Sequence, residues 1–199
     1  MKSRIITPAI LISGLLTMQQ SPALADAKTD GDKGIEEFRQ GNLIESMQLL
    51  ERSAKGGYTP AQTTLAYILD ISERDEEAFN WYQQAADSND PAGIFGLGNM
   101  YAKGEGTGRD PQKAGQLIRR AAEMAHVLAM RAYAYALENG ALGFARDDTA
   151  AVEWFHRAAE AGDQVSMRRL QDAYSQGQLG LPLNPAQASV WEQKIKSDN

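Results

Sequence analysis

Residues 152–163 read VEWFHRAAEAGD, and the same pattern occurs upstream as QLIRRAAEMAH (116–126) and NWYQQAADSND (80–90). Each copy contains an Ala-Ala pair, and successive pairs are 36 and 37 residues apart. A large apolar residue lies four positions before each pair, and an alanine lies seven positions before it. Spacings of three, four and seven residues place side chains on one face of a helix. This period indicates a tandem array of helical repeats.

Each repeat contains a second helix, because apolar residues continue at helical spacing after each Ala-Ala pair. Alanines at helix crossings let two backbones approach closely, and a single hairpin cannot bury both of its faces. We therefore predict an all-α fold, a right-handed α-solenoid of about five helix-turn-helix repeats. The expected helices span residues 32–40 and 43–55, 60–70 and 73–88, 91–102 and 110–125, 127–138 and 147–161, and 164–176 and 184–197.

The combined pattern, A-x-x-x-L-G-x-x-Y-x-x-G-x-G-x-x-x-D-x-x-x-A-x-x-W-x-x-x-A-A, resembles the Sel-one-like repeat, a relative of the tetratricopeptide repeat. Copies that begin near Gly93, Ala129 and Ser166 match it well. The unit 61–88 lacks the glycine loop, and the unit before it is closer to a plain tetratricopeptide hairpin. The resemblance implies a scaffold or adaptor for other proteins, and exported bacterial members are similar to regulators, virulence factors and immunity proteins against secreted toxins.

The loop YAKGEGTGRDPQKA (101–114) has the alternating glycines of a phosphate-binding loop. It recurs as NGALGFARDD (139–148) and QGQLGLPLNP (176–185), each time after a helix and without the Gly-Lys-Ser/Thr ending that a phosphate loop needs. We therefore expect no nucleotide and no other cofactor. The first glycine of each loop is expected to end a helix in the left-handed conformation, and a later Asp or Asn to cap the next helix. These residues are Gly104, Gly140 and Gly177, and Asp110, Asp147 and Asn184.

The first 25 residues have the pattern of a secretory signal peptide. Lys2 and Arg4 precede an uncharged apolar run, and Ala23-Leu24-Ala25 supplies the small residues that signal peptidase requires. We predict a signal peptide at 1–25, a short linker at 26–33 and a repeat domain at 34–199. The 14-residue apolar run is shorter than the ~20 residues that span a bilayer, so no stable membrane insertion is expected after cleavage.

The overall composition restricts the location and the partners. The chain has no cysteine, which excludes lipid attachment at cysteine, disulfides and thiol nucleophiles. Its formal charge of −6 becomes −8 when Lys2 and Arg4 are removed with the leader, and such a surface does not favour nucleic acid. The mature protein is expected in the periplasm, with secretion as the second choice.

The titratable residues offer little basis for catalysis or metal binding. His126 and His156 lie on different predicted elements and have no helix-spaced partner, so no metal site is expected. In DISERDEEA (70–78), Ser72 and Asp75 have the spacing of a capping box, and neighbouring glutamates on a helix diverge. We predict no catalytic residues.

The groove lined by the first helix of each repeat is the expected binding surface. Side chains two positions before, two after and five after the large apolar residue of each first helix should face it. The predicted partner-binding residues are Tyr67, Phe95, Asn99, Arg131, Tyr135, Glu138, Arg168 and Asp172. The same rule adds Thr63, Asp70, Ala102 and Ser175.

Arg131 and Arg168 have two alternative roles. They are 37 residues apart, so they are expected to stack one repeat from each other and could bind an acidic or extended peptide. Alternatively, they pair with neighbouring acids such as Glu138 and Asp172.

These features favour a non-catalytic periplasmic or secreted repeat protein that binds a protein or an extended peptide in its concave groove. It could act as an adaptor or regulator, or as an immunity protein that neutralises a secreted toxin. The alternative is a cell-wall-active hydrolase, because penicillin-processing activity is attributed to some cysteine-rich relatives of the family. The lack of cysteine and of a nucleophile motif argues against that alternative.

Overall fold

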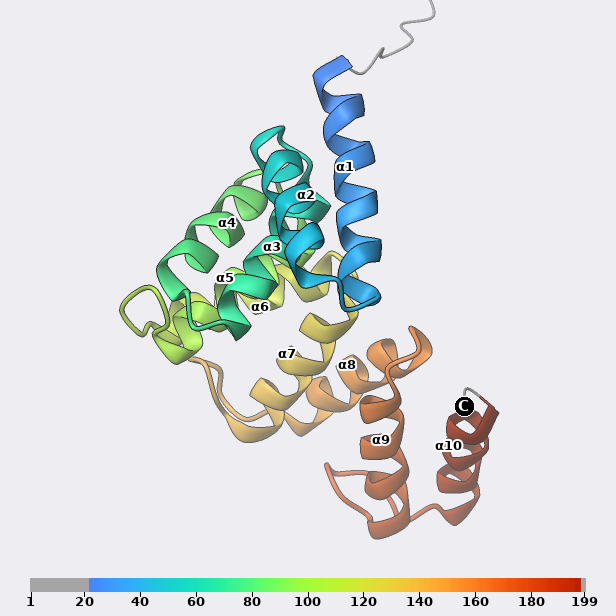
Figure 1. The fold of residues 1–199 in the computed structure, drawn as a ribbon. Coiled ribbons are helices and arrows are strands. Elements are labelled where there is room, and N and C mark those ends of the chain that lie inside the picture. Colours follow the sequence, from blue (N-terminus) through green and yellow to red (C-terminus); the bar gives the residue numbers. More distant parts are fainter. Residues whose placement is uncertain (1–21, 198–199) are drawn as a thin grey trace, which may run out of the picture.

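The computed structural model describes residues 22–197, and within this range the chain forms ten α-helices and no β-strand. Each helix packs on the next along the chain, and Figure 1 shows the helix pairs stacked along a curved path. The predicted all-α solenoid of helix-turn-helix repeats is thereby confirmed. The helices are α1 (Pro22–Arg39), α2 (Leu43–Lys55), α3 (Thr59–Ile71), α4 (Asp75–Asp87), α5 (Pro91–Lys103), α6 (Pro111–Glu123), α7 (Val127–Asn139), α8 (Asp148–Glu160), α9 (Gln164–Gln176) and α10 (Pro185–Ser197).

The first helix of each repeat is called the A helix here (α1, α3, α5, α7 and α9), and the second is called the B helix. Nine of the ten helices begin and end within two residues of the predicted positions. The exception is α1, which was expected at 32–40 and begins at Pro22 instead. Residues 26–33, predicted as a linker, therefore lie inside a helix.

Small residues at helical spacing explain the length of α1. Ala27, Gly31 and Gly34 are buried along one side of the helix. The hydroxyl of Ser53 in α2 donates to the carbonyl of Ala27 at 2.5 Å, and that of Ser46 donates to the carbonyl of Gly34 at 2.8 Å. The polar, glycine-rich composition of this segment is like that of a linker, but its small residues pack against α2.

The core follows the repeated alanines. Ala85, Ala121 and Ala158, the first members of the three Ala-Ala pairs, are completely buried. Trp191 is buried as well, whereas Trp81 and Trp154 are half-buried at the edge of the core. These positions confirm that small side chains mediate the close helix crossings and that large ones fill the space beside them.

The predicted helix ends at the glycine loops are confirmed. Gly104, Gly140 and Gly177 end α5, α7 and α9 with φ values of 86°, 62° and 67°, a region that glycine adopts without a Cβ clash. The carboxylates of Asp110 and Asp147 and the amide oxygen of Asn184 accept hydrogen bonds from the first turns of α6, α8 and α10.

The predicted capping box at α4 is wrong. The helix begins at Asp75, and its N-cap residue Arg74 makes no side-chain cap hydrogen bond. The Ser72 hydroxyl instead donates to the Ile68 carbonyl at 2.7 Å, so it is used in the last turn of α3.

Residues 1–21 of the predicted signal peptide lie outside the described residues. Among the described helices, none has the length and apolar character needed to cross a membrane.

Candidate functional site

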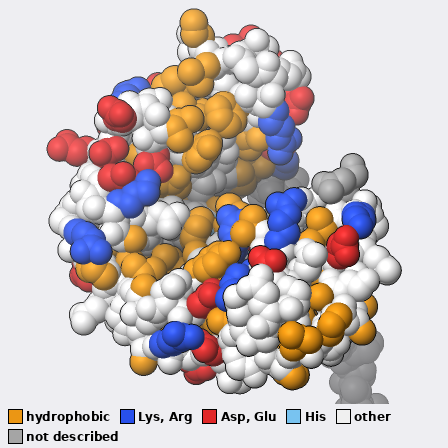
Figure 2. Space-filling model, turned by 90° about the horizontal axis from the view of Figure 1, so that it is seen from below, with side chains coloured by type: hydrophobic (Ala, Val, Ile, Leu, Met, Phe, Trp, Pro, Cys, Tyr) orange, Lys and Arg blue, Asp and Glu red, His pale blue; other side chains and the backbone are white. Residues whose placement is uncertain are grey.

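An apolar groove of about 460 Å³ lies along the A helices of the N-terminal half. Its volume falls within the range of ligand-binding clefts in proteins. Figure 2 shows a hollowed face of the molecule with hydrophobic side chains gathered along the hollow. The groove is lined by Ile35, Phe38, Arg39, Thr63, Thr64, Tyr67, Asp70, Tyr82, Ala92, Phe95, Gly96, Asn99, His126 and Leu128.

Aromatic and aliphatic side chains form the walls of the groove. The rings of Phe38 in α1 and Tyr67 in α3 meet edge to face, with centroids 6.2 Å apart. Tyr67 is nevertheless 49% exposed, and Leu128 at the start of α7 is 44% exposed. Large apolar side chains left open to solvent in a concave surface are typical of a site that another molecule covers.

The absence of a side chain at Gly96 makes room for the Tyr82 ring in the groove. A Cβ atom at Gly96 would lie 2.2 Å from the Tyr82 ring, so only glycine lets this ring pack directly on the α5 backbone. Glycine inside a helix costs about 1 kcal/mol relative to alanine. The close approach of the ring gives the physical reason for a glycine at this position.

Asp70 brings a carboxylate to the end of α3, within the same groove. Burial raises its pKa, and the nearby Lys103 acts in the opposite direction. Among the described residues, no hydrogen bond or ion pair involves this carboxylate. The Lys103 ammonium is 2.8 Å from the Glu105 carboxylate and pairs with that group instead.

His126 contributes to the groove and to helix α7 at the same time. Its Nδ1 accepts a hydrogen bond from the Ala129 backbone N–H at 3.3 Å, and its ring lies 5.0 Å from that of Phe95. Burial lowers the pKa of His126, and Asp90 opposes this shift more weakly. The neutral ring is therefore the form that caps the helix and lines the groove.

Of the predicted partner-binding residues, the groove brings together Tyr67, Phe95 and Asn99, and Thr63 and Asp70 join them. The other five lie outside it. Sequence reasoning did not place Phe38, Tyr82, His126 or Leu128 in the groove. Phe38 belongs to a helix whose repeat register was not assigned, and Tyr82 comes from a B helix.

Arg131 has an internal partner. Its Nη1 donates to the Asp163 carboxylate at 2.7 Å, and the Asp163 side chain is only 6% exposed. Asp163 also accepts hydrogen bonds from the backbone N–H and the hydroxyl of Ser166 at the start of α9. The structure thus favours the pairing alternative for Arg131, although the acid is Asp163 and not Glu138 or Asp172.

Glu138 is also engaged inside the protein. Arg169 of α9 binds it with two guanidinium nitrogens, the shortest distance being 2.6 Å. Tyr135 packs edge to face on Phe155, with ring centroids 4.9 Å apart. Arg168 and Asp172 remain exposed on α9, and Arg168 reaches the Gln164 side chain at 3.3 Å.

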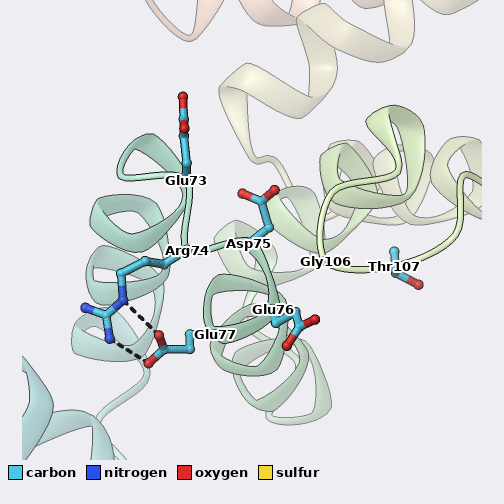
Figure 3. A pocket seen from close by; sticks show the side chains of 7 residues that line it. All are labelled: Glu73, Arg74, Asp75, Glu76, Glu77, Gly106 and Thr107. Atoms are coloured by element: carbon cyan, nitrogen blue, oxygen red, sulfur yellow. Dashed lines mark hydrogen bonds and ion pairs between the residues drawn. The ribbon is translucent and has the colours of Figure 1, made fainter.

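The acidic stretch at the start of α4 does not converge on a site. Figure 3 shows the Glu73, Asp75 and Glu76 carboxylates apart from one another, with Glu76 turned away from the other two. Glu77 is held by Arg74 through hydrogen bonds of 2.7 and 2.8 Å. In residues 22–197, no group of three or more histidine, aspartate or glutamate side chains is arranged to hold a metal ion.

His156 lies on α8 and is half-buried. Its side chain contacts α9 and α10, with its Nε2 3.4 Å from the Tyr174 hydroxyl and its ring 5.4 Å from that of Trp191. Its role is packing in the last repeat.

The fold defines a helical-repeat protein of the solenoid class. A model of the Sel1 repeat matches residues 24–58, 61–90, 91–126 and 127–163, so the chain belongs to the Sel1 repeat family. The first match corrects the expectation that this unit is nearer to a plain tetratricopeptide hairpin. Residues 164–197 continue the array as the helix pair α9 and α10. Sel1 repeat proteins generally mediate protein–protein interactions and typically act as non-catalytic scaffolds.

Two solved structures are similar over most of the chain. A Sel1 repeat protein from Oxalobacter formigenes shares 25% identity at a TM-score of 0.78, covering 85% of this chain and 70% of its own. The protective antigen c5321 of uropathogenic Escherichia coli shares 32% identity at a TM-score of 0.71, covering 86% of this chain and 38% of its own.

Among curated relatives, an uncharacterized protein of Neisseria meningitidis serogroup B is 37% identical over 71 residues, which is 34% of this chain. The matched region is 15% of the length of that relative.

Proposed function

We propose that this chain is a non-catalytic binding protein that holds an extended segment of a protein partner in the apolar groove. The observation that carries the proposal is the exposure of Tyr67 and Leu128 in a groove of about 460 Å³ formed by successive A helices. A segment laid across these helices would contact several repeats at once. It would bury the two open apolar side chains.

The proposal includes export to the periplasm, with secretion as the second possibility. Its support is the leader pattern in the sequence together with the packing of α1. Ala25 and Asp26 are exposed, and Ala27 is the first buried residue among the described side chains of α1. Cleavage after Ala25 would keep Ala27 and the later buried residues of this helix, Gly31 and Gly34, in place. Mass spectrometry of the protein recovered from periplasm should give an N-terminus at Asp26, and an intact Met1 or a different start would contradict this cleavage.

The biological role proposed is that of an adaptor or regulator, or of an immunity protein against a secreted toxin. The acidic character of the chain, with a formal charge of −6, suits a basic partner and disfavours nucleic acid. A neighbouring gene for a secreted lipase, nuclease or muramidase would support the immunity role. The hydrolase alternative predicts turnover of cell-wall fragments or penicillin by the purified protein, which a binding protein would not show.

The groove is tested with two matched double variants. Tyr67→Ser/Leu128→Ser removes two exposed apolar side chains of the groove, and Ile44→Ser/Val190→Ser removes two exposed ones elsewhere. Partners cross-linked to the wild-type protein in periplasm are identified, purified and titrated against each variant. We expect the groove variant to lose affinity by about tenfold or more, since burying one such side chain contributes about 1.5–3 kcal/mol, and the control to bind as the wild type does. Equal affinity of both variants would refute the groove as the binding site.

A further inference from the structure

The ion pair between Glu138 and Arg169 joins two neighbouring repeats. Glu138 lies five residues after the large apolar residue Tyr133 of α7, and Arg169 lies one residue before Leu170, its equivalent in α9. The pair is bidentate, and the two side chains are only 17% and 15% exposed. At this register, a carboxylate at the end of one A helix is thus neutralised by an arginine from the next A helix.

The same register occurs between α3 and α5, but there the acid has no ion-pair partner among residues 22–197. Asp70 lies five residues after Leu65, which makes it the equivalent of Glu138. The residue one position before Leu97 is Gly96, which therefore takes the place of Arg169. Asp70 has a raised pKa because burial penalises its charged form, and no hydrogen bond or ion pair to its carboxylate is found among residues 22–197. Lys103 acts on this carboxylate only at longer range, because its ammonium pairs with Glu105. A half-buried carboxylate without a paired cation is costly.

We propose that Asp70 pairs with an arginine side chain of the partner segment, much as Glu138 pairs with Arg169. This inference rests on the proposed use of the groove and specifies the chemistry of the segment that the groove accepts. The partner segment therefore contains an arginine next to apolar residues. An unpaired Arg131 and Arg168 would instead have favoured an acidic segment.

The surroundings of Asp70 favour arginine over lysine. Tyr67 and Tyr82 line the same groove, so the cation would meet aromatic side chains there. A planar guanidinium stacks on aromatic rings and forms two hydrogen bonds to one carboxylate, whereas an ammonium does neither as well. The acidic charge of the whole chain draws such a segment toward the protein.

The test uses a library of acetylated and amidated octapeptides retained on the immobilised protein, residues 26–199, followed by sequencing of the bound pool. We expect enrichment of arginine beside leucine or an aromatic residue. A selected peptide is then titrated by fluorescence anisotropy in two forms, one with arginine and one with citrulline, which has the same shape without the charge. The proteins compared are the wild type, Asp70→Asn and the control Asp172→Asn, which removes one exposed carboxylate outside the groove.

Replacing arginine by citrulline should weaken binding to the wild type and to Asp172→Asn by about tenfold or more, as expected for a charge-assisted hydrogen bond. It should have little effect on binding to Asp70→Asn, because the acceptor charge is already absent. A citrulline effect that is equally large in Asp70→Asn would overturn the inference. If the retained peptides are enriched in apolar residues but not in arginine, the inference about Asp70 is wrong, whereas the proposed binding function of the groove is not contradicted. If no peptide is retained, or if Tyr67→Ser/Leu128→Ser retains the same pool, the groove function and this inference both fail.

Discussion

Replacing Arg131 by methionine should destabilise the protein without weakening partner binding. The substitution keeps much of the aliphatic stem but removes the guanidinium that donates to Asp163 at 2.7 Å. The Asp163 carboxylate would keep its two hydrogen bonds from Ser166 at 2.7 and 2.8 Å. It would nevertheless lose its only cation within the described residues while its side chain remains 6% exposed.

The expected cost follows from these contacts. A hydrogen bond to a charged group contributes about 1.5–3 kcal/mol. The Arg131 side chain is 29% exposed, so solvent screens part of this pair and the lower half of that range applies, about 2 kcal/mol. Arg168→Met is the matched control, since Arg168 is exposed and its hydrogen bond to Gln164 is 3.3 Å long. Its cost should stay within about 0.5 kcal/mol.

Urea unfolding followed by circular dichroism measures both variants, and hydrogen exchange adds a local reading at the start of α9. The Ser166 amide donates to Asp163, so its exchange should accelerate in Arg131→Met and remain unchanged in Arg168→Met. If the two variants unfold at the same urea concentration and exchange alike, Arg131 does not act as a structural residue. Arg131 would then be a candidate for the binding surface again.

Three further predictions concern the groove and the repeat interfaces. Because burial lowers the pKa of His126 from its usual value of 6.5, the neutral ring's stabilisation is complete above about pH 6.5 and is lost as pH falls below it. His126→Asn keeps a cap acceptor that does not titrate. When the pH is lowered from about 7.5 to about 5, the free energy of unfolding in urea should therefore fall less in this variant than in the wild type. Equal losses in the two proteins would contradict this. Gly96→Ala should cost roughly 1–3 kcal/mol by overpacking and reduce peptide affinity, whereas Gly98→Ala, whose added Cβ would be 3.0 Å from the nearest atom, should cost less in the same assays. Arg169→Met should lower stability by roughly 2–3 kcal/mol and Arg169→Met/Glu138→Met by less, because the double variant leaves no unpaired acid; a larger loss in the double variant would argue against the ion pair.

Most of the fold could be predicted from the sequence, because each repeat carries its own local signals. The alanine spacing fixes which helix faces meet, and left-handed glycines such as Gly140 and cap residues such as Asp147 fix where helices end and begin. The prediction was wrong at α1, where no Ala-Ala pair marks the register. At α1, Gly31 and Gly34 pack against α2. From the sequence alone, these glycines are equally compatible with helix packing and with a flexible linker.

Less of the site could be predicted, because counting along one helix gives the face of a residue but not its neighbour in the next repeat. Phe95 and Arg131 occupy the same repeat position. Phe95 meets the ring of His126, and Arg131 meets the carboxylate of Asp163, the N-cap residue one repeat later. Phe95 and Arg131 therefore both contact the N-cap residue of the following A helix. The aromatic residue meets an aromatic cap, and the cation meets an acidic cap.

This pairing across repeats also explains why the groove lies in the N-terminal half of the array. Between α7 and α9, the Arg131–Asp163 and Arg169–Glu138 ion pairs fill the register positions that face the next A helix. Between α3 and α5, the position equivalent to Arg169 is Gly96, and Asp70 forms no ion pair within the described part of the chain. Where the charged side chains of neighbouring repeats pair with each other, few unpaired polar groups remain at that interface for a ligand to bind. Binding is therefore expected where the internal partner is missing, which in this chain is the groove around Asp70.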